Sequence, residues 1–421
     1  MLNSTEDDYV WSYSADNNLS GEESVYLLSD DPLVNCTRSV PNASIPPSHM
    51  YVMYKIIMDV YIVGILCLAG FIGNILSIVV LNRDKEKQNT TNWLLQTLAA
   101  VDIVYLIACL FIQPFKTVQD LTDWSPRWLK VVFPYVEPYS WGVASIAQTG
   151  AVWLVLLVTV DRYVAVCLPW QNQWRSLTRA KVAVAVILIT ATVYNIPRFL
   201  EREIIYRTDC ETGEVTVLSQ KTEFRNSRLY FLVYKTVCYF IFRTVGPLTT
   251  LIVLNSRLMR ELQVIRRRHR DLTKRSKHRE NITTMLIVVV TVFIVCQLPD
   301  LGVRIAVTIS EFAPTVNINF DLLRYANAAS NTLLALNSSV NFVIYCLVGK
   351  KFRKILVKIC RCSRNAGSPK QGFDNEVSET EHVPLNVSTQ SQGLAGREVL
   401  QKYVKAQVEN TTNGNTNIQI H

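Results

Sequence analysis

Charged residues are scarce in this sequence, at 18% of 421 residues, and long stretches carry none. Residues 60–81 (VYIVGILCLAGFIGNILSIVVL) contain no charged side chain and exceed the roughly 20 residues that an α-helix needs to cross a bilayer. Comparable apolar runs follow at 93–115, 139–168, 182–196, 229–254, 283–299 and 322–348. The sequence therefore predicts an all-α membrane protein, a bundle of seven transmembrane helices.

Motifs of several enzyme and transport classes are also missing. No H-E-x-x-H, no G-x-S-x-G and no pair of intramembrane aspartates occurs, so we expect neither an enzyme nor a cofactor. No two short, Gly/Pro-interrupted spans mark equivalent halves of the chain. Apart from Asp102 and Arg243, the midsections of the spans hold few ionisable residues. A transporter or channel remains open only as an alternative.

The charges that are present are sorted by segment. Residues 1–50 are acidic, and they lack the basic start and short apolar core of a cleaved signal peptide. They also hold N-x-S/T sequons, which are typical of a translocated, glycosylated segment, at Asn3, Asn18, Asn35 and Asn42. The basic excess behind the net charge of +9 lies in 257–280 and 349–364, and Lys and Arg concentrate in cytoplasmic loops. We therefore expect a multi-pass plasma-membrane protein with an extracellular amino terminus, and no nucleic-acid partner.

This topology divides the chain into four parts. Residues 1–50 are the extracellular glycosylated tail, and residues 51–349 form the bundle in the lipid bilayer. Residues 350–362 alternate basic and apolar side chains at helical spacing, which predicts an amphipathic helix on the membrane surface. Residues 363–421 are polar and poor in aromatics, which predicts a disordered cytoplasmic tail.

The amphipathic helix carries two further predictions. Its apolar side chains are expected to face lipid; they are Phe352, Ile355, Leu356 and Ile359. Cys360 and Cys362 follow them and are candidates for palmitoylation, the alternative being unmodified thiols.

Charged residues interrupt the third apolar run near its end. The stretch VTVDRYVAVC sets Asp161, Arg162 and Tyr163 at the expected cytosolic end of that span. A charge in hydrocarbon costs several kcal/mol unless it is paired, so such residues usually mark a function. The alternative is a static salt bridge at the membrane interface.

Seven spans, an outside amino terminus and this D-R-Y sequence resemble the rhodopsin-like G-protein-coupled receptors, over roughly residues 51–362. The resemblance rests on an ordered set of motifs on the expected spans. That set comprises Asn74 in GFIGN, Asp102 in LAAVD, Pro247, Phe293 and Pro299 in FIVCQLP, and Asn337, Asn341 and Tyr345 in NSSVNFVIY. It implies a ligand-controlled exchange factor that acts on a heterotrimeric G protein.

The same resemblance implies how the receptor switches. In the resting state Arg162 would pair with Asp161, and on activation the sixth helix would swing outward and release Arg162 to the G protein. The residues implied in this switch are Asp161, Arg162, Tyr163, Phe293, Gln297, Pro299, Asn341 and Tyr345. Ser378 and Thr380 lie among acids in the tail, and they are candidate sites for a receptor kinase and subsequent arrestin binding.

A buried polar cluster is implied around Asp102. The resemblance places Asn74, Asn337 and Ser338 beside this carboxylate, and in the family the cluster often holds sodium. Here Ala151 stands where the third helix usually adds a hydroxyl, which argues against sodium at Asp102.

The sequence also departs from the family pattern. Phe342 replaces a proline, Gln297 replaces a tryptophan, and the usual cysteine at the start of the third helix should fall near Glu137. Only Cys36 and Cys210 are expected in the oxidising compartment, so a Cys36–Cys210 disulfide is the predicted replacement, with free thiols as the alternative.

The ligand class is narrowed first by exclusion. Amine receptors carry an aspartate where this chain has Ala144, and light receptors carry a lysine where it has Ala335. Charged and polar residues gather at the extracellular ends of the spans instead. The resulting ligand-binding candidates are Glu137, Tyr139, Gln148, Arg198, Glu201, Glu203, Asp300 and Arg304.

Residues 134–153 (PYVEPYSWGVASIAQTGAVW) and 194–201 (YNIPRFLE) are similar to segments of invertebrate FMRFamide-type neuropeptide receptors. This similarity implies a short peptide ending in Arg-Phe-amide and a calcium-mobilising G protein. Carboxylates would bind the arginine. The phenylalanine would meet aromatics such as Tyr135, Tyr139, Trp141 and Phe312. A different amidated neuropeptide stays open as the alternative.

Overall fold

Within the part of the chain that it describes, the computed structural model has seven helical segments that are long and apolar enough to cross a membrane, which confirms the predicted bundle. These spans are His49–Asn82, Thr90–Gln119, Lys130–Cys167, Leu177–Leu200, Arg228–Arg267, Ile282–Phe312 and Phe320–Val348. The structure describes residues 36–37, 48–83, 90–121, 127–174, 176–209, 215–268, 274–313, 316 and 318–366. The asparagines of the four sequons, together with Cys210, Ser378 and Thr380, lie outside these residues.

The first two spans combine α-helices with a π-helical stretch, and the third span is a single α-helix. Their elements are α1 (His49–Lys55), η1 (Ile56–Val63) and α2 (Gly64–Asn82), then α3 (Thr90–Leu110), η2 (Phe111–Phe115) and α4 (Lys116–Leu121), then α5 (Arg127–Cys167). Pro114 lies within η2. Because proline has no N–H to donate, the wider turn at η2 has a local cause.

The remaining helices follow in chain order. They are η3 (Pro169–Trp174), α6 (Leu177–Asn195), η4 (Ile196–Leu200), α7 (Glu223–Asn226), α8 (Arg228–Tyr230), η5 (Phe231–Thr244), α9 (Val245–Arg268), α10 (Lys274–Phe312), α11 (Phe320–Val348) and α12 (Lys350–Ala366). Asn319 is the N-cap of α11, because its side chain accepts a hydrogen bond from the Leu322 amide at 3.0 Å.

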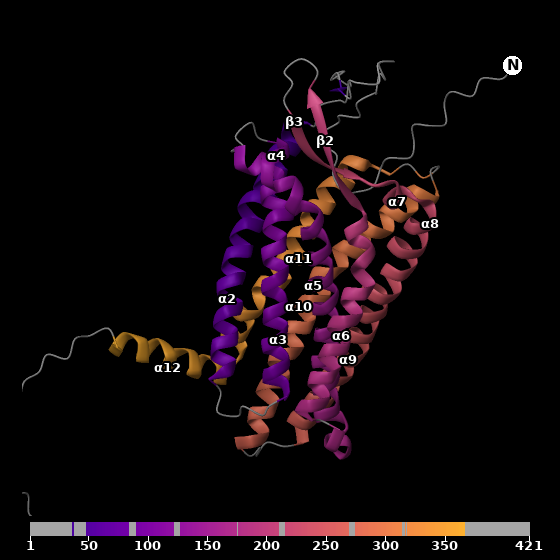
Figure 1. Cartoon of the computed structure of the whole chain (residues 1–421). Coiled ribbons are helices and arrows are strands. Elements are labelled where there is room, and N and C mark those ends of the chain that lie inside the picture. The colour runs from indigo at the N-terminus through magenta and orange to yellow at the C-terminus, as the bar shows by residue number, and fades with distance from the viewer. Residues whose placement is uncertain are drawn as a thin grey trace, which may run out of the picture. The chain divides into compact units, whose positions relative to one another are not determined.

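A small sheet covers one end of the bundle (Figure 1). Strands β2 (Arg202–Asp209) and β3 (Val215–Lys221) form an antiparallel hairpin between the fourth and fifth spans. β1 (Cys36–Thr37) adds to β2 in parallel, with Cys36 opposite Thr208. We call this the hairpin end of the bundle. The opposite end, from which α12 leaves, is the α12 end.

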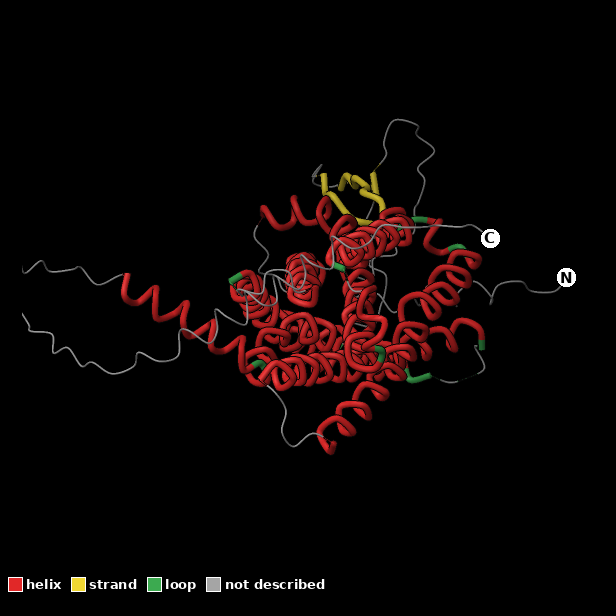
Figure 2. Tube along the Cα trace, turned by 90° about the horizontal axis from the view of Figure 1, so that it is seen from below, coloured by secondary structure: helices red, strands yellow, loops and turns green. Residues whose placement is uncertain are grey.

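The outward surfaces of the spans are apolar. Large hydrophobic side chains such as Ile65, Leu68, Val186 and Ile189 are exposed. A soluble protein rarely exposes so many contiguous apolar residues, whereas a lipid-facing helix must. Figure 2 shows the helices grouped side by side, with the strands at one edge and α12 projecting from another.

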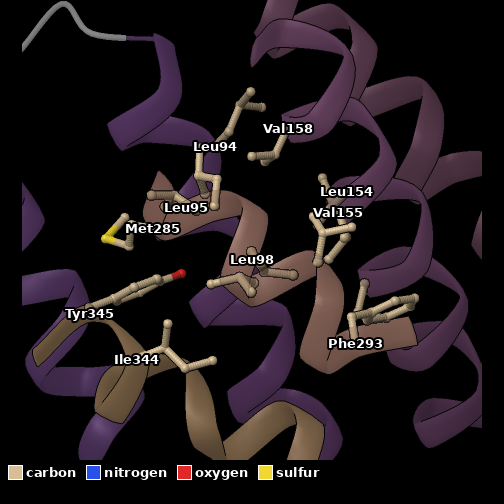
Figure 3. Close-up of a cluster of buried hydrophobic side chains, with 14 of the residues drawn as sticks. Leu94, Leu95, Leu98, Leu154, Val155, Val158, Met285, Phe293, Ile344 and Tyr345 are labelled. Atoms are coloured by element: carbon tan, nitrogen blue, oxygen red, sulfur yellow. The ribbon is translucent and has the colours of Figure 1, made fainter. Parts of the chain in front are cut away.

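The interior holds the packing core. Toward the α12 end, buried side chains from α3, α5, α10 and α11 form one hydrophobic cluster. Figure 3 shows this cluster; its labelled members are Leu94, Leu95, Leu98, Leu154, Val155, Val158, Met285, Phe293, Ile344 and Tyr345. Two of the residues implied in switching, Phe293 and Tyr345, are therefore part of the core that joins the spans.

Helix α12 follows α11 after Gly349 and differs from its prediction at one residue. Phe352 is buried, with its ring centroid 5.6 Å from that of Tyr345 and 5.9 Å from that of Phe342. The prediction that Phe352 faces lipid is therefore wrong, because it anchors the first turn of α12 on α11. Ile355 is half-buried further along the helix, whereas Cys360 is exposed.

Candidate functional site

Glu201 is the centre of a buried ion-pair cluster at the hairpin end. Its carboxylate is 3.0 Å from the guanidinium of Arg198, 3.6 Å from Lys235 Nζ and 3.7 Å from the guanidinium of Arg225. The Tyr230 hydroxyl donates to the same carboxylate at 2.6 Å. These partners come from η4 before the hairpin and from α7, α8 and η5 after it, so one carboxylate joins two segments that the hairpin separates along the chain.

Burial alone would raise the pKa of Glu201. The charges of Arg198, Lys235 and Arg225, together with the Tyr230 hydrogen bond, more than offset that effect and hold its pKa below the ordinary value. Glu201 is therefore ionised at neutral pH and balances part of a local positive excess.

A close approach of η4 to α5 helps to position this cluster. The ring of Phe199 lies against Gly142 of α5, so that a Cβ at Gly142 would come within 2.4 Å of the ring. Glycine is the residue that allows this contact. Arg198 and Glu201 flank Phe199 and are carried to the bundle with it.

Glu137 forms a second cluster at the same end. Its carboxylate lies 2.8 Å from Lys116 Nζ and 3.2 Å from the Arg202 guanidinium, and its side chain is only 3% exposed. Arg202 begins β2 and Lys116 begins α4. At the position where the resemblance puts a cysteine, the chain thus has a buried ion pair that joins the third span to the hairpin.

Asp300 forms a third cluster, deeper in the bundle. The Tyr239 hydroxyl donates to it at 2.8 Å, and Arg304 Nε lies 3.3 Å from its other carboxylate oxygen. Two guanidiniums lie over the Tyr239 ring, that of Arg304 at 4.4 Å and that of Arg243 at 5.0 Å from its centroid. Arg243 also donates a hydrogen bond to the side-chain oxygen of Gln148.

Six of the eight predicted ligand-binding residues thus belong to these clusters, but two do not. The side chains of Tyr139 and Glu203 are exposed. The prediction also missed the cations and phenols that surround the carboxylates; they are Lys116, Arg225, Tyr230, Lys235 and Tyr239. A charge inside an apolar run, such as Lys235, was the available signal.

The polar cluster around Asp102 occupies the bundle interior. Asn341 Nδ2 donates to the buried Asp102 carboxylate at 2.8 Å, and Ser338 also hydrogen-bonds to it. Asn74 reaches the same region by donating to the backbone oxygen of Ser338 at 2.9 Å. Asn337 is half-buried in α11. The second span is thereby tied to the seventh through Asp102, and the first span is tied to the seventh through Asn74.

Arg162 lies buried toward the α12 end. Its guanidinium is 2.5 Å from the Asp161 carboxylate, and it also donates to the Thr91 hydroxyl. Thr91 in turn donates to Asp161 at 3.0 Å. The predicted pairing of Arg162 with Asp161 is present, and Thr91 of α3 is a partner that the sequence did not indicate.

The other switch residues lie on α5 and α10. Tyr163 is half-buried beside Arg162, whereas Gln297 is buried in α10. Pro299 is exposed within the same helix, two residues further on.

Comparison with known proteins decides the family. A model described as "7 transmembrane receptor (rhodopsin family)" matches residues 73–345, which is more than half of the chain. The chain belongs to this family. It is therefore a receptor rather than an enzyme, and its D-R-Y, Asp102 and NFVIY residues lie on the spans that the resemblance assigned to them.

Relatives of this receptor include proteins named for peptides. It is 31% identical to an FMRFamide receptor of Drosophila melanogaster over 303 residues, which cover 71% of this chain and 52% of that protein. The match thus spans about half the length of the fly receptor. An FMRFamide peptide receptor of Caenorhabditis elegans is 23% identical over 336 residues, covering 79% of this chain and 76% of that one. Prokineticin receptor 1 of Homo sapiens is 27% identical over 343 residues, covering 78% and 82%.

Proposed function

We propose that this receptor binds a short amidated neuropeptide of the Arg-Phe-amide type and activates a heterotrimeric G protein. The observation that carries the proposal is the match to FMRFamide receptors of two invertebrates, one of them at 31% identity. The hairpin end supplies buried carboxylates and aromatic rings, which are the groups that recognise arginine and phenylalanine side chains.

The proposed orientation has the hairpin end outside the cell. The basic side chains of α12, such as Lys350 and Lys354, then meet the cytoplasmic surface, as the distribution of Lys and Arg in membrane proteins favours. The same orientation makes the sequons of the tail accessible to glycosylation. It also puts Cys36 and Cys210 in the oxidising compartment, and the pairing of Cys36 with Thr208 in the sheet supports a disulfide between them.

We propose that activation changes the partners of Arg162. In the state described here Arg162 is held by Asp161 and Thr91. A ligand that binds better to the arrangement with α10 displaced shifts the population toward it, and Arg162 then contacts the G protein. Kinase and arrestin action on the tail and palmitoylation at Cys360 or Cys362 belong to the same proposal.

The test is intracellular calcium in cells that express the full chain with a promiscuous Gα subunit. We expect Arg-Phe-amide peptides to act at nanomolar concentration, and Arg162→Ala to abolish the response with surface expression intact. Silence toward the whole panel of amidated peptides, with receptor at the surface, would remove the proposed ligand class.

A second candidate is a peptide of different sequence. The matches to prokineticin receptors, at 26–28% identity over most of both chains, favour this alternative. Including prokineticins in the panel separates the two candidates, because only one class of peptide should act at nanomolar concentration.

A further inference from the structure

The Asp300 cluster has the composition of a binding site for a guanidinium group. A carboxylate that is 2% exposed lies beside an aromatic ring, and the ring's hydroxyl fixes the carboxylate. A guanidinium gains from both at once, by pairing with the carboxylate and by stacking on the ring. The group that uses both here is the chain's own Arg304, at 3.3 Å from Asp300 and 4.4 Å from the ring centroid of Tyr239.

Arg304 is the most exposed cation among the three carboxylate clusters at the hairpin end. Its side chain is 38% exposed, against 4–12% for the cations around Glu137 and Glu201. Its ion pair with Asp300 lies within a single helix turn, four residues apart, and its contact with another element is the stack on the Tyr239 ring that an incoming guanidinium would replace. Because Arg304 is the most exposed of these cations, water screens its attraction to Asp300 more than it screens the other ion pairs. Arg304 is therefore the cation that a competitor can replace at the smallest cost.

The charges around Asp300 favour replacing Arg304 by another guanidinium over adding a second guanidinium beside it. Asp300 is buried, and a buried carboxylate left without a cation is strongly unfavourable. Arg243 already lies over the same ring at 5.0 Å, so a further guanidinium would add a like charge unless Arg304 leaves. One guanidinium enters as another departs, and the charge at Asp300 stays balanced throughout.

We propose that Asp300 and Tyr239 form an arginine subsite that Arg304 fills until the arginine of the ligand replaces it. Tyr239 and Asp300 lie on η5 and α10, and Gln148 and Arg243 extend the cluster to α5 and η5. This subsite rests on the proposed function for its natural ligand. Its chemistry can be tested without the peptide.

The test measures thermal unfolding of the purified full-length receptor in detergent, with argininamide as the probe. Arg304→Met keeps an aliphatic stem but removes the guanidinium. We expect argininamide to raise the midpoint of this variant by about 2 °C or more at saturating concentration, and to leave the original receptor unchanged. Citrullinamide, which is uncharged and of similar shape, should stabilise neither.

Two controls make the result specific. Arg324→Met removes a guanidinium of similar exposure that pairs with Asp321, whose side chain is 81% exposed, and argininamide should not stabilise it. The double variant Asp300→Asn/Arg304→Met should lose the stabilisation. If Arg304→Met does not fold, Arg304→Lys takes its place, because lysine lacks the planar fork and should yield to argininamide more readily than arginine does.

The proposal is overturned if argininamide fails to stabilise the Arg304 variant, or if it stabilises the Asp300→Asn double variant equally. A peptide arm separates this result from the proposed function. With Phe-Met-Arg-Phe-amide, Arg304→Met should lower the half-maximal concentration about two- to fivefold, with no such gain for the citrulline analogue. Stabilisation by argininamide without any peptide response supports the subsite and counts against the ligand class; the reverse pattern does the opposite.

Discussion

The two ends of the bundle use buried charge differently. At the hairpin end, Glu137 and Glu201 each draw cations from several elements, so their ion pairs join segments that the sequence separates. At the α12 end, Arg162 makes its short ion pair with Asp161, the preceding residue of its own helix. Ion pairs between elements fix the relative positions of those elements, whereas the Arg162–Asp161 pair is joined to α3 through the Thr91 hydroxyl, which is a weaker link than an ion pair. The contrast suggests a rigid hairpin end and an α12 end that can change partners.

Among these changes, removing the Glu201 carboxylate should cause the largest loss of stability at the hairpin end. Glu201→Gln leaves Arg198, Arg225 and Lys235 without their shared carboxylate, and losing one member of a buried ion pair typically costs about 3–5 kcal/mol. We expect a large drop in the thermal midpoint of the purified receptor and reduced surface expression. Glu203→Gln, two residues away and exposed, should change stability by less than about 0.5 kcal/mol. Equal effects at the two positions would refute the role of the cluster.

The Glu137 pair is the next largest contribution. Glu137→Gln leaves Lys116 and Arg202 facing an amide, and we expect a loss of about 2–3 kcal/mol. A double-mutant cycle with Arg202→Gln, followed by thermal unfolding, measures the coupling directly. If the third span and the hairpin are joined through this pair, the double variant should be more stable than the two single losses predict. Strict additivity would show that the pair contributes nothing.

These clusters also mark the limit of what the sequence could predict. The seven spans followed from long apolar runs with few charges, because lipid excludes unpaired charge. The ends of the helices did not follow from these runs. Helix α10 extends over Lys274–Phe312, whereas the predicted span was 283–299. Hydropathy identifies only the lipid-buried part of a helix, and the helical hydrogen bonds continue beyond that part. The sequence analysis did not predict the hairpin. Its two strands are held by backbone pairing between 202–208 and 215–221, and no residue pattern in the sequence indicated that pairing.

The prediction of the candidate site included its acids and two of their partners, Arg198 and Arg304, but not the other partners. Glu137, Glu201 and Asp300 were predicted as ligand-binding candidates, and the structure shows all three paired with the chain's own cations. Lys116 lies 21 residues before Glu137, and Lys235 lies well beyond Glu201 across the hairpin. Such partners are brought together by the packing of the spans, and the spacing of residues along the sequence does not predict that packing.

At the α12 end, removing one hydroxyl should weaken the contacts that hold Arg162, with a smaller effect than the changes at Glu201 and Glu137. Thr91→Val removes the hydroxyl that bridges Arg162 and Asp161, a contribution of about 1 kcal/mol. Because the resting arrangement alone loses this bond, we expect ligand-independent calcium signalling to rise about two- to fivefold. Thr97→Val is the matched control on the same helix, since its hydroxyl donates to the Trp93 carbonyl of its own helix. Unchanged basal signalling in Thr91→Val would show that the bridge does not hold the resting state.

The smallest effect is expected from external pH, and its sign follows from Glu201. Because the folded state holds the pKa of Glu201 below its ordinary value of 4.5, the carboxylate contributes stability that is fully present above that value and is lost as pH falls through the lower, folded pKa. The difference in thermal midpoint between the original receptor and Glu201→Gln should therefore stay constant from about pH 7.5 to about pH 5 and narrow only in stronger acid. Narrowing that begins near pH 6 would mean a raised pKa instead. In that case Arg198, Arg225 and Lys235 would not offset the burial of the carboxylate, and the contrast between the two ends of the bundle would lose its main support.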